Sequence, residues 1–137
     1  MTKVLFLCVH NSGRSQMAEA FLKKYAGARF EVASAGLEAG ALNPYVVRAM
    51  AEVGIDISRN LTKSVWDLFQ AGRIYQVVVA VCSKEAAERC PIFPGLSKKL
   101  HWPFDDPAAL AGSDDRIMAG VRKIRELIEA AVKEFIA

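Results

Sequence analysis

Cys8-Val9-His10-Asn11-Ser12-Gly13-Arg14-Ser15 is the stretch from which the fold of this chain can be worked out. An apolar run over residues 4–7 leads into it, and an amphipathic stretch over residues 16–25 follows it. This pattern predicts a strand, a tight loop and the first turn of a helix. The backbone N–H groups of such a loop and the N-terminus of the helix attract negative charge, so the loop is suited to hold a tetrahedral oxyanion.

Two side chains of this loop, Cys8 and Arg14, carry the chemistry. The field of the loop and the helix favours the thiolate form of Cys8, and the thiolate is the nucleophile. Arg14 can place two parallel donors on two oxygens of a bound anion. The pair therefore predicts attack by sulfur on a phosphate-like centre. The competing interpretation is a strand-to-helix turn with an inert buried cysteine, because the spacing of these two residues is not specific by itself.

The other loop residues favour the anion-binding interpretation. Asn11 and Gly13 tolerate the left-handed backbone that a tight anion-binding loop needs. The Ser15 hydroxyl is expected within reach of the Cys8 sulfur or of a loop amide. The candidate anion-binding residues are His10, Asn11, Ser12, Gly13, Arg14 and Ser15.

The composition indicates one globular domain over residues 1–137, with 53% hydrophobic residues. The net charge is +3, and no cluster of lysines or arginines suggests a nucleic-acid groove. No apolar run approaches the length of a membrane span, and the apolar stretch near the N-terminus is too short for a secretory signal. We therefore expect a cytoplasmic monomer, without nucleic-acid or membrane partners, whose three cysteines stay reduced.

Short β-rich runs alternate with helical stretches along the chain. Strands are predicted over residues 3–8, 30–34, 76–81 and 99–102. Helices are predicted over residues 15–26, over 44–53 with Asn43 as N-cap, over 64–71, and from Ser113 or Asp114 to the C-terminus. The last helix carries an apolar stripe at intervals of three and four residues, which assigns that face to the core. The alternation predicts an α/β fold: an open, mostly parallel sheet with helices on both faces.

Parallel sheets bind ligands outside the carboxyl ends of their strands. Cys8 ends the first predicted strand, and Cys82 follows the strand over 76–81. Asp105 and Asp106 follow the last predicted strand. We therefore expect both sulfurs and both carboxylates at one edge of the sheet.

Cys82 and Cys90 admit three interpretations. They can be ordinary buried cysteines, which is the default for a reducing compartment. They can bind a metal, but their spacing matches no common zinc motif, and we expect no metal site and no cofactor. They can form a thiol relay with Cys8. We favour the relay, because the segment 83–89 between them is charged and helix-prone, unlike the usual surroundings of structural buried cysteines.

The loop from Cys8 to Glu19 resembles that of the thioredoxin-coupled arsenate reductases, which share the fold of the low-molecular-weight protein tyrosine phosphatases. The resemblance covers nearly the whole chain and implies a four-stranded parallel sheet in the order 2-1-3-4. The other segments that carry it are Ser34-Ala35-Gly36, Asn43-Pro44, Ala49-Met50, Gly54-Ile55-Asp56-Ile57-Ser58, Val81-Cys82-Ser83, Cys90-Pro91 and His101-Trp102-Pro103-Phe104-Asp105-Asp106-Pro107.

The same resemblance implies roles for the site residues. Cys8 is implied as the nucleophile, Arg14 as the oxyanion clamp, Cys82 and Cys90 as the second and third thiols of the relay, and Asp106 as the general acid, with Asp105 as the fallback. The implied substrate is arsenate, which phosphate or sulfate can mimic. The implied reductant is thioredoxin.

Some members of the family hold a potassium ion. Asn11, Glu19 and Ser34 match residues of that site. The aspartate that completes it is replaced here by Lys63 or Ser64, depending on the placement of a gap. We therefore expect no bound potassium.

Three functions stay open from the sequence, and arsenate reduction is the one we favour. The second is a phosphatase that hydrolyses small phosphoesters through a phosphocysteine at Cys8. Against it, Ala108 follows Asp106-Pro107 where tyrosine phosphatases carry a tyrosine that helps to hold phosphotyrosine. The third is a non-enzymatic trithiol sensor of arsenite or a metal, which would have no use for Arg14 or an acid.

Overall fold

The computed structural model describes residues 1–137 and contains one four-stranded sheet. Its strands are β1 (Thr2–Cys8), β2 (Phe30–Gly36), β3 (Val77–Ala80) and β4 (Lys98–His101). All neighbouring pairs are parallel, and the order across the sheet is β2-β1-β3-β4. This confirms the parallel sheet and the strand order 2-1-3-4.

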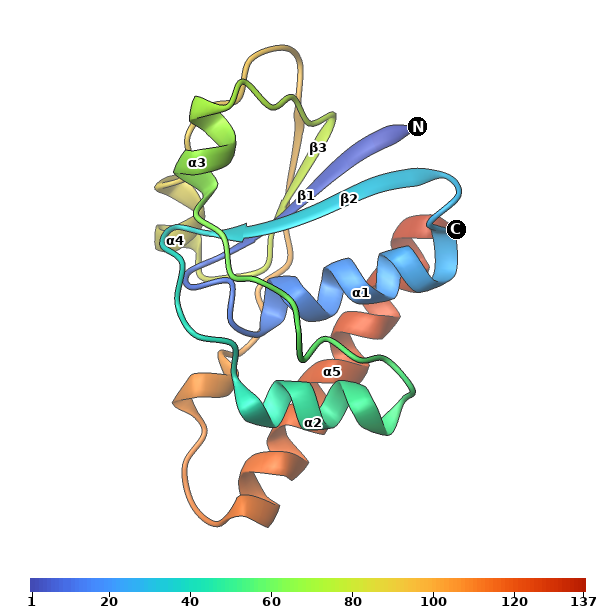
Figure 1. The fold of residues 1–137 in the computed structure, drawn as a ribbon, viewed down its shortest axis with the longest axis vertical. Coiled ribbons are helices and arrows are strands. Elements are labelled where there is room, and N and C mark those ends of the chain that lie inside the picture. The colour runs from blue at the N-terminus through green and yellow to red at the C-terminus, as the bar shows by residue number, and fades with distance from the viewer.

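Five α-helices and one 3₁₀ turn connect and cover the strands. They are α1 (Arg14–Ala26), α2 (Pro44–Glu52), α3 (Val65–Gln70), α4 (Lys84–Glu88), η1 (Pro107–Ala109) and α5 (Asp114–Ile136). Figure 1 shows α1, α2 and α5 gathered on one side of the sheet, and α3 and α4 on the other. None of these helices combines the length and the apolar character needed to cross a membrane.

Two of the helices begin at the residues that the sequence predicts. Asn43 Oδ1 accepts a hydrogen bond from the Tyr45 backbone N–H at 2.9 Å, and Pro44 is the first residue of α2. Ser113 Oγ accepts from the Arg116 N–H at 3.3 Å and so caps α5. These side chains satisfy N–H groups that have no partner inside the helix.

Alternate residues of the strands face the two layers of helices. On one face, the Phe6 ring contacts Trp102, which contacts Phe135 of α5, with ring centroids 5.8 Å apart in both pairs. The predicted stripe of α5 packs toward this core, and its buried residues are Met118, Val121, Ile124, Ile128 and Val132. On the other face, Leu7, Val78 and Ala80 border a cavity beneath α4.

The loop after β1 is held by the chain that follows β2. The backbone N–H groups of Leu37 and Gly40 donate to the carbonyl oxygens of Cys8 and His10, at 3.0 and 2.9 Å. Gly36 lies so close to the loop that a Cβ atom there would come within 2.6 Å of the Asn11 nitrogen. Glycine at this position lets the two backbones approach and fixes the shape of the loop after Cys8.

Candidate active site

The Cys8 sulfur lies at the centre of the loop and accepts hydrogen bonds from it. The Asn11 backbone N–H donates to the sulfur at 3.1 Å, and Ser15 Oγ lies 2.8 Å from it. The side chain is buried, with 2% of the residue exposed. The hydroxyl of Ser15 therefore reaches the sulfur, which is one of the two arrangements expected from the sequence.

A chain of hydrogen bonds explains which way the Ser15 hydroxyl points. Asn11 Nδ2 donates to Ser15 Oγ at 2.8 Å and to Ser34 Oγ at 3.0 Å. Ser34 in turn donates to the Glu19 carboxylate at 2.5 Å. Because Ser15 Oγ already accepts from Asn11, its own proton is free to point at Cys8. Both donors to the sulfur stabilise negative charge on it.

Asn11 adopts the left-handed backbone that the loop needs, with φ of 56°. Gly13 does not: its φ is −148° and its ψ is −83°, so the expectation of a left-handed glycine there is wrong. A Cβ on Gly13 would lie 3.3 Å from Cγ2 of Val46 and 3.5 Å from Cγ of Pro107.

The remaining predicted loop residues lie at the rim. His10 Nδ1 lies 2.9 Å from the Glu38 carboxylate, and both side chains are largely exposed. The Ser12 carbonyl accepts from the Asn43 N–H at 2.9 Å, which ties the loop to the start of α2. Neither side chain contacts the sulfur, so their part in anion binding stays a prediction.

Arg14 is the first residue of α1 and connects the loop to the segment after β4. Its Nη1 donates to the Phe104 carbonyl at 3.0 Å, and its Nη2 lies 3.6 Å from Asp106 Oδ2. Asp106 Oδ1 also caps η1 by accepting from the Ala108 N–H at 2.9 Å. Asp105 is exposed. The structure thus brings Asp106, rather than its neighbour, to the guanidinium of the loop.

Cys82 lies two residues after the end of β3, at the same edge of the sheet as Cys8. Its side chain is buried, and burial raises the pKa of the Cys82 thiol. The nearby Arg14 guanidinium opposes that rise in pKa, and charge on Cys8 adds to it. The Cys82 carbonyl lies 2.7 Å from His101 Nε2. The structure places Asp106 beside Arg14, and the joint role expected for Cys8, Cys82 and Asp106 stays a prediction.

Cys90 lies beyond α4 and away from this group. All three cysteines are free, and Cys90 is partly buried in the wall of the cavity beneath α4. Burial raises the pKa of the Cys90 thiol to about 11, against an opposing effect of Lys99. Its sulfur donates to the Pro91 carbonyl at 3.4 Å. In this state the third thiol is protonated and turned toward its own segment.

The residues that match the potassium site of other members do not fit a cation here. Lys23 Nζ lies 2.7 Å from the Glu19 carboxylate. Burial lowers the pKa of Lys63, and the charge of Glu19 opposes that shift, so a second ammonium group lies near the same carboxylate. The Lys63 backbone N–H donates to Asn11 Oδ1 at 3.0 Å. Two lysines thus already supply the positive charge beside Glu19.

The low molecular weight phosphotyrosine protein phosphatase family model matches residues 3–137. The chain belongs to this family.

Relatives within the phosphotyrosine protein phosphatase family include arsenate reductases. The arsenate reductase of Bacillus subtilis is 45% identical over 132 residues, which cover 96% of this chain and 93% of that protein. A structure of an arsenate reductase in the phosphate binding state has a TM-score of 0.77 at 30% identity and covers 99% of this chain and 97% of the other. The thioredoxin-dependent arsenate reductase of Corynebacterium glutamicum has a TM-score of 0.73 at 32% identity, with 98% of this chain matched to 60% of that chain. The resemblance seen in the sequence is confirmed.

Two supporting residues are not predicted from the sequence. Gln16 is fully buried, and its Nε2 donates to the Asn11 backbone and side-chain oxygens at 3.2 and 3.1 Å. Gln16 lies in the first turn of α1, which also buries Arg14, Ser15 and Glu19, and its place directly after the loop motif is the signal that could have pointed to it. His101 holds the Cys82 carbonyl only through the pairing of β3 with β4, which no local pattern reveals.

We predict that Cys8 reacts with iodoacetamide near neutral pH about tenfold or more faster than Cys82 or Cys90. The Asn11 N–H donates to the Cys8 sulfur and the Ser15 hydroxyl lies against it, whereas burial raises the pKa of the other two thiols. Peptide mapping after timed alkylation measures the three rates. Phosphate should slow the reaction of Cys8 alone. Equal rates at all three sites, unchanged by phosphate, would contradict an anion-binding role for the loop.

Proposed function

We propose that this protein reduces arsenate to arsenite through a relay of three cysteines, Cys8, Cys82 and Cys90, and that thioredoxin reduces the final disulfide. The observation that carries the proposal is the position of Cys8. Its sulfur accepts a hydrogen bond from the Asn11 N–H and lies 2.8 Å from Ser15 Oγ in a loop that ends at Arg14, whose charge also opposes the rise in the pKa of Cys82. The arsenate reductases among the relatives support the choice of substrate.

The first step is attack of the Cys8 thiolate on arsenic. Arsenate has the shape and charge of phosphate, so the loop amides and the N-terminus of α1 can hold it. In the structure the Arg14 guanidinium contacts the Phe104 carbonyl and the Asp106 carboxylate, and a bound oxyanion would compete with them for its N–H groups. Asp106, beside Arg14, is the proposed general acid and gives a proton to the departing oxygen, which leaves as water.

The second step moves two electrons to arsenic. The Cys82 thiolate attacks the Cys8 sulfur, the sulfur–arsenic bond breaks, and its electron pair stays on arsenic. Arsenic leaves as arsenite, and a Cys8–Cys82 disulfide remains. Arg14 suits this step as well, since its charge opposes the effect of burial on the pKa of Cys82.

In the third step the disulfide moves from the Cys8–Cys82 pair to Cys82–Cys90, nearer the surface. Cys90 attacks Cys82, a Cys82–Cys90 disulfide forms, and Cys8 leaves as a thiolate. A thiolate that the loop stabilises is a good leaving group, which gives the exchange its direction. Thioredoxin, a dithiol protein, then reduces Cys82–Cys90 and becomes oxidised itself.

This last exchange requires α4 to unwind. Cys90 lies eight positions after Cys82, and a helical rise of about 1.5 Å per residue over that whole span would place them on the order of 12 Å apart. A disulfide needs Cα atoms about 4.4–6.8 Å apart. The segment suits such a change, because α4 has five residues and only Ala86 among them is buried. The Ser83 cap and the His101 contact with Cys82 are the restraints to be released.

Phosphoester hydrolysis is the second candidate. It needs only Cys8, Arg14 and the acid, with water in place of the second thiol. A cavity of about 300 Å³ adjoins the loop and is lined in part by Ser12, Tyr45 and Ala108. The tyrosine ring offers an apolar wall for an aryl group near the position where Ala108 provides none. Arsenate reduction and phosphoester hydrolysis both use Cys8, but only arsenate reduction needs Cys82 and Cys90.

We expect Cys8→Ser to abolish both arsenate reduction and the hydrolysis of p-nitrophenyl phosphate. Cys82→Ser and Cys90→Ser should stop arsenate turnover while leaving hydrolysis within about twofold of the parent, because hydrolysis uses neither thiol. NADPH consumption with thioredoxin and thioredoxin reductase measures turnover. If Cys90→Ser reduces arsenate at the parent rate with thioredoxin, the three-thiol relay is wrong. Hydrolysis without any arsenate turnover in the parent would favour the phosphatase instead.

A matched pair of variants separates the two neighbouring carboxylates. Asp106→Asn should lower kcat for hydrolysis about a hundredfold, because it removes the proton donor beside Arg14. Asp105→Asn should stay close to the parent, since that side chain is exposed. Steady-state hydrolysis at several pH values gives both results. The reverse ranking would assign the acid to Asp105.

A further inference from the structure

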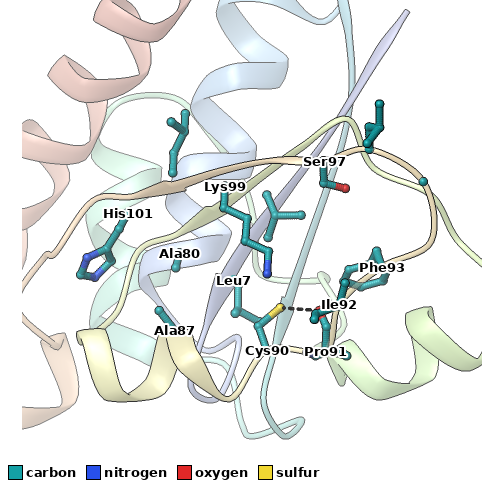
Figure 2. Close-up of a pocket in the computed structure, with 14 residues that line it drawn as sticks. Leu7, Ala80, Ala87, Cys90, Pro91, Ile92, Phe93, Ser97, Lys99 and His101 are labelled. Atoms are coloured by element: carbon teal, nitrogen blue, oxygen red, sulfur yellow. Dashed lines mark hydrogen bonds between the residues drawn. The ribbon is translucent and has the colours of Figure 1, made fainter.

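Cys90 and Lys99, a lysine of β4, both line the cavity beneath α4. Its volume is about 340 Å³, and much of its wall is apolar, including Leu7, Val78 and Phe93. Only three side chains around it can carry a charge or a thiolate: Cys90, Lys99 and His101. Figure 2 shows the Lys99 side chain running from β4 along the cavity with its nitrogen pointing toward the Cys90 sulfur. No carboxylate lines this space.

The fold fixes which lysine of β4 faces the cavity. Lys99 pairs in register with Val78 and His101 with Ala80, so all four share one face of the sheet. Lys98 precedes them on the opposite face. Neither lysine forms an ion pair with a carboxylate in the structure, so the charge of Lys99 is not already neutralised by a neighbour.

We propose that Lys99 is a positioning residue for the third thiol: while α4 is folded, the Lys99 ammonium group stabilises the Cys90 thiolate and so raises the fraction of that thiol ready to attack the Cys8–Cys82 disulfide. The inference rests on the proposed relay. In this step the Cys90 proton leaves to water at the mouth of the cavity, the Cys82–Cys90 bond forms, and Cys8 departs with the electron pair of the broken bond. The ammonium group offsets the charge that the sulfur acquires among apolar side chains.

The surroundings of Cys90 disfavour its thiolate, so a nearby positive charge is needed to stabilise it. Burial raises the pKa of Cys90 to about 11, and charge on Cys82 works in the same direction. Lys99 is the group that opposes them. His101 stands on the same wall but turns its Nε2 to the Cys82 carbonyl. An exposed lysine acts through water in part, so its effect is a modest change in rate rather than an absolute requirement.

Removing the charge of Lys99 should slow the alkylation of Cys90 by about threefold. If the pKa of Cys90 rises by about one unit, its thiolate fraction falls about tenfold, and the more basic sulfur regains about threefold in nucleophilicity. The direct test uses a Cys8→Ser/Cys82→Ser background, in which Cys90 is the single thiol, and measures alkylation by iodoacetamide. We expect Lys99→Met to react about threefold more slowly below the pKa, and Lys99→Arg and the control Lys98→Met to match the background. The difference in rate between Lys99→Met and the background should shrink in about 0.5 M salt, because salt screens the charge. A difference caused by altered access of the reagent to Cys90 would not shrink.

A second measurement, in the three-thiol protein, follows formation of the Cys82–Cys90 disulfide after one equivalent of arsenate. Lys99→Met should slow it near neutral pH, with the difference fading as the pH approaches the pKa of Cys90. Equal alkylation rates for Lys99→Met and Lys98→Met would overturn the role of Lys99 and leave the relay standing. A parent protein that forms no Cys82–Cys90 disulfide would overturn the relay, and the role of Lys99 with it.

Discussion

The shape of the active-site loop depends on one buried side chain, Asn11. It takes the left-handed backbone conformation, donates to Ser15 and Ser34, and accepts from Gln16 and the Lys63 backbone. These bonds join the loop to α1, to β2 and to the segment before α3. Removing such a group leaves several buried partners unsatisfied, each at a cost of about 1–3 kcal/mol. The two donors on the Cys8 sulfur are therefore fixed by the fold, before any substrate arrives.

The three thiols differ in what surrounds them, and the difference sets the order of the proposed relay. Cys8 has donors on its sulfur, whereas burial raises the pKa of both Cys82 and Cys90. With a pKa of about 11, about one Cys90 in ten thousand is a thiolate near neutral pH. The proposed relay therefore assigns the attack on arsenic to Cys8. The other two thiols act only once a reactive sulfur centre has formed beside them, and each has a cation nearby, Arg14 or Lys99.

Much of the fold was predictable because local signals and tertiary structure agree. The apolar run before Cys8 and the capped starts at Asn43 and Ser113 place β1, α2 and α5 correctly. The third strand was predicted over 76–81, one residue longer at each end than β3, and Gln76 and Val81 still donate backbone hydrogen bonds to the carbonyl oxygens of Lys3 and Leu7. The 3₁₀ turn at Pro107–Ala109 was not predicted, since its cap forms from the Asp106 side chain within a short loop.

The site was predicted in its composition and less well in its geometry. The loop residues follow from a contiguous motif, but the choice between Asp105 and Asp106 depends on which carboxylate reaches Arg14. Gly13 was expected to be left-handed because glycine permits it, yet its φ is −148° in the structure. The place of Lys99 follows from the register of β4 against β3, which a single strand does not encode.

The relay is tested most directly by mapping disulfides after a single turnover without any external reductant. One equivalent of arsenate should yield one equivalent of arsenite, a Cys82–Cys90 disulfide and a free Cys8 thiol, because the two electrons leave the protein's own sulfurs. In Cys90→Ser the reaction should stop with a Cys8–Cys82 disulfide after the same amount of arsenite. Arsenite released with no disulfide, or with Cys8 joined to Cys90, would contradict the account.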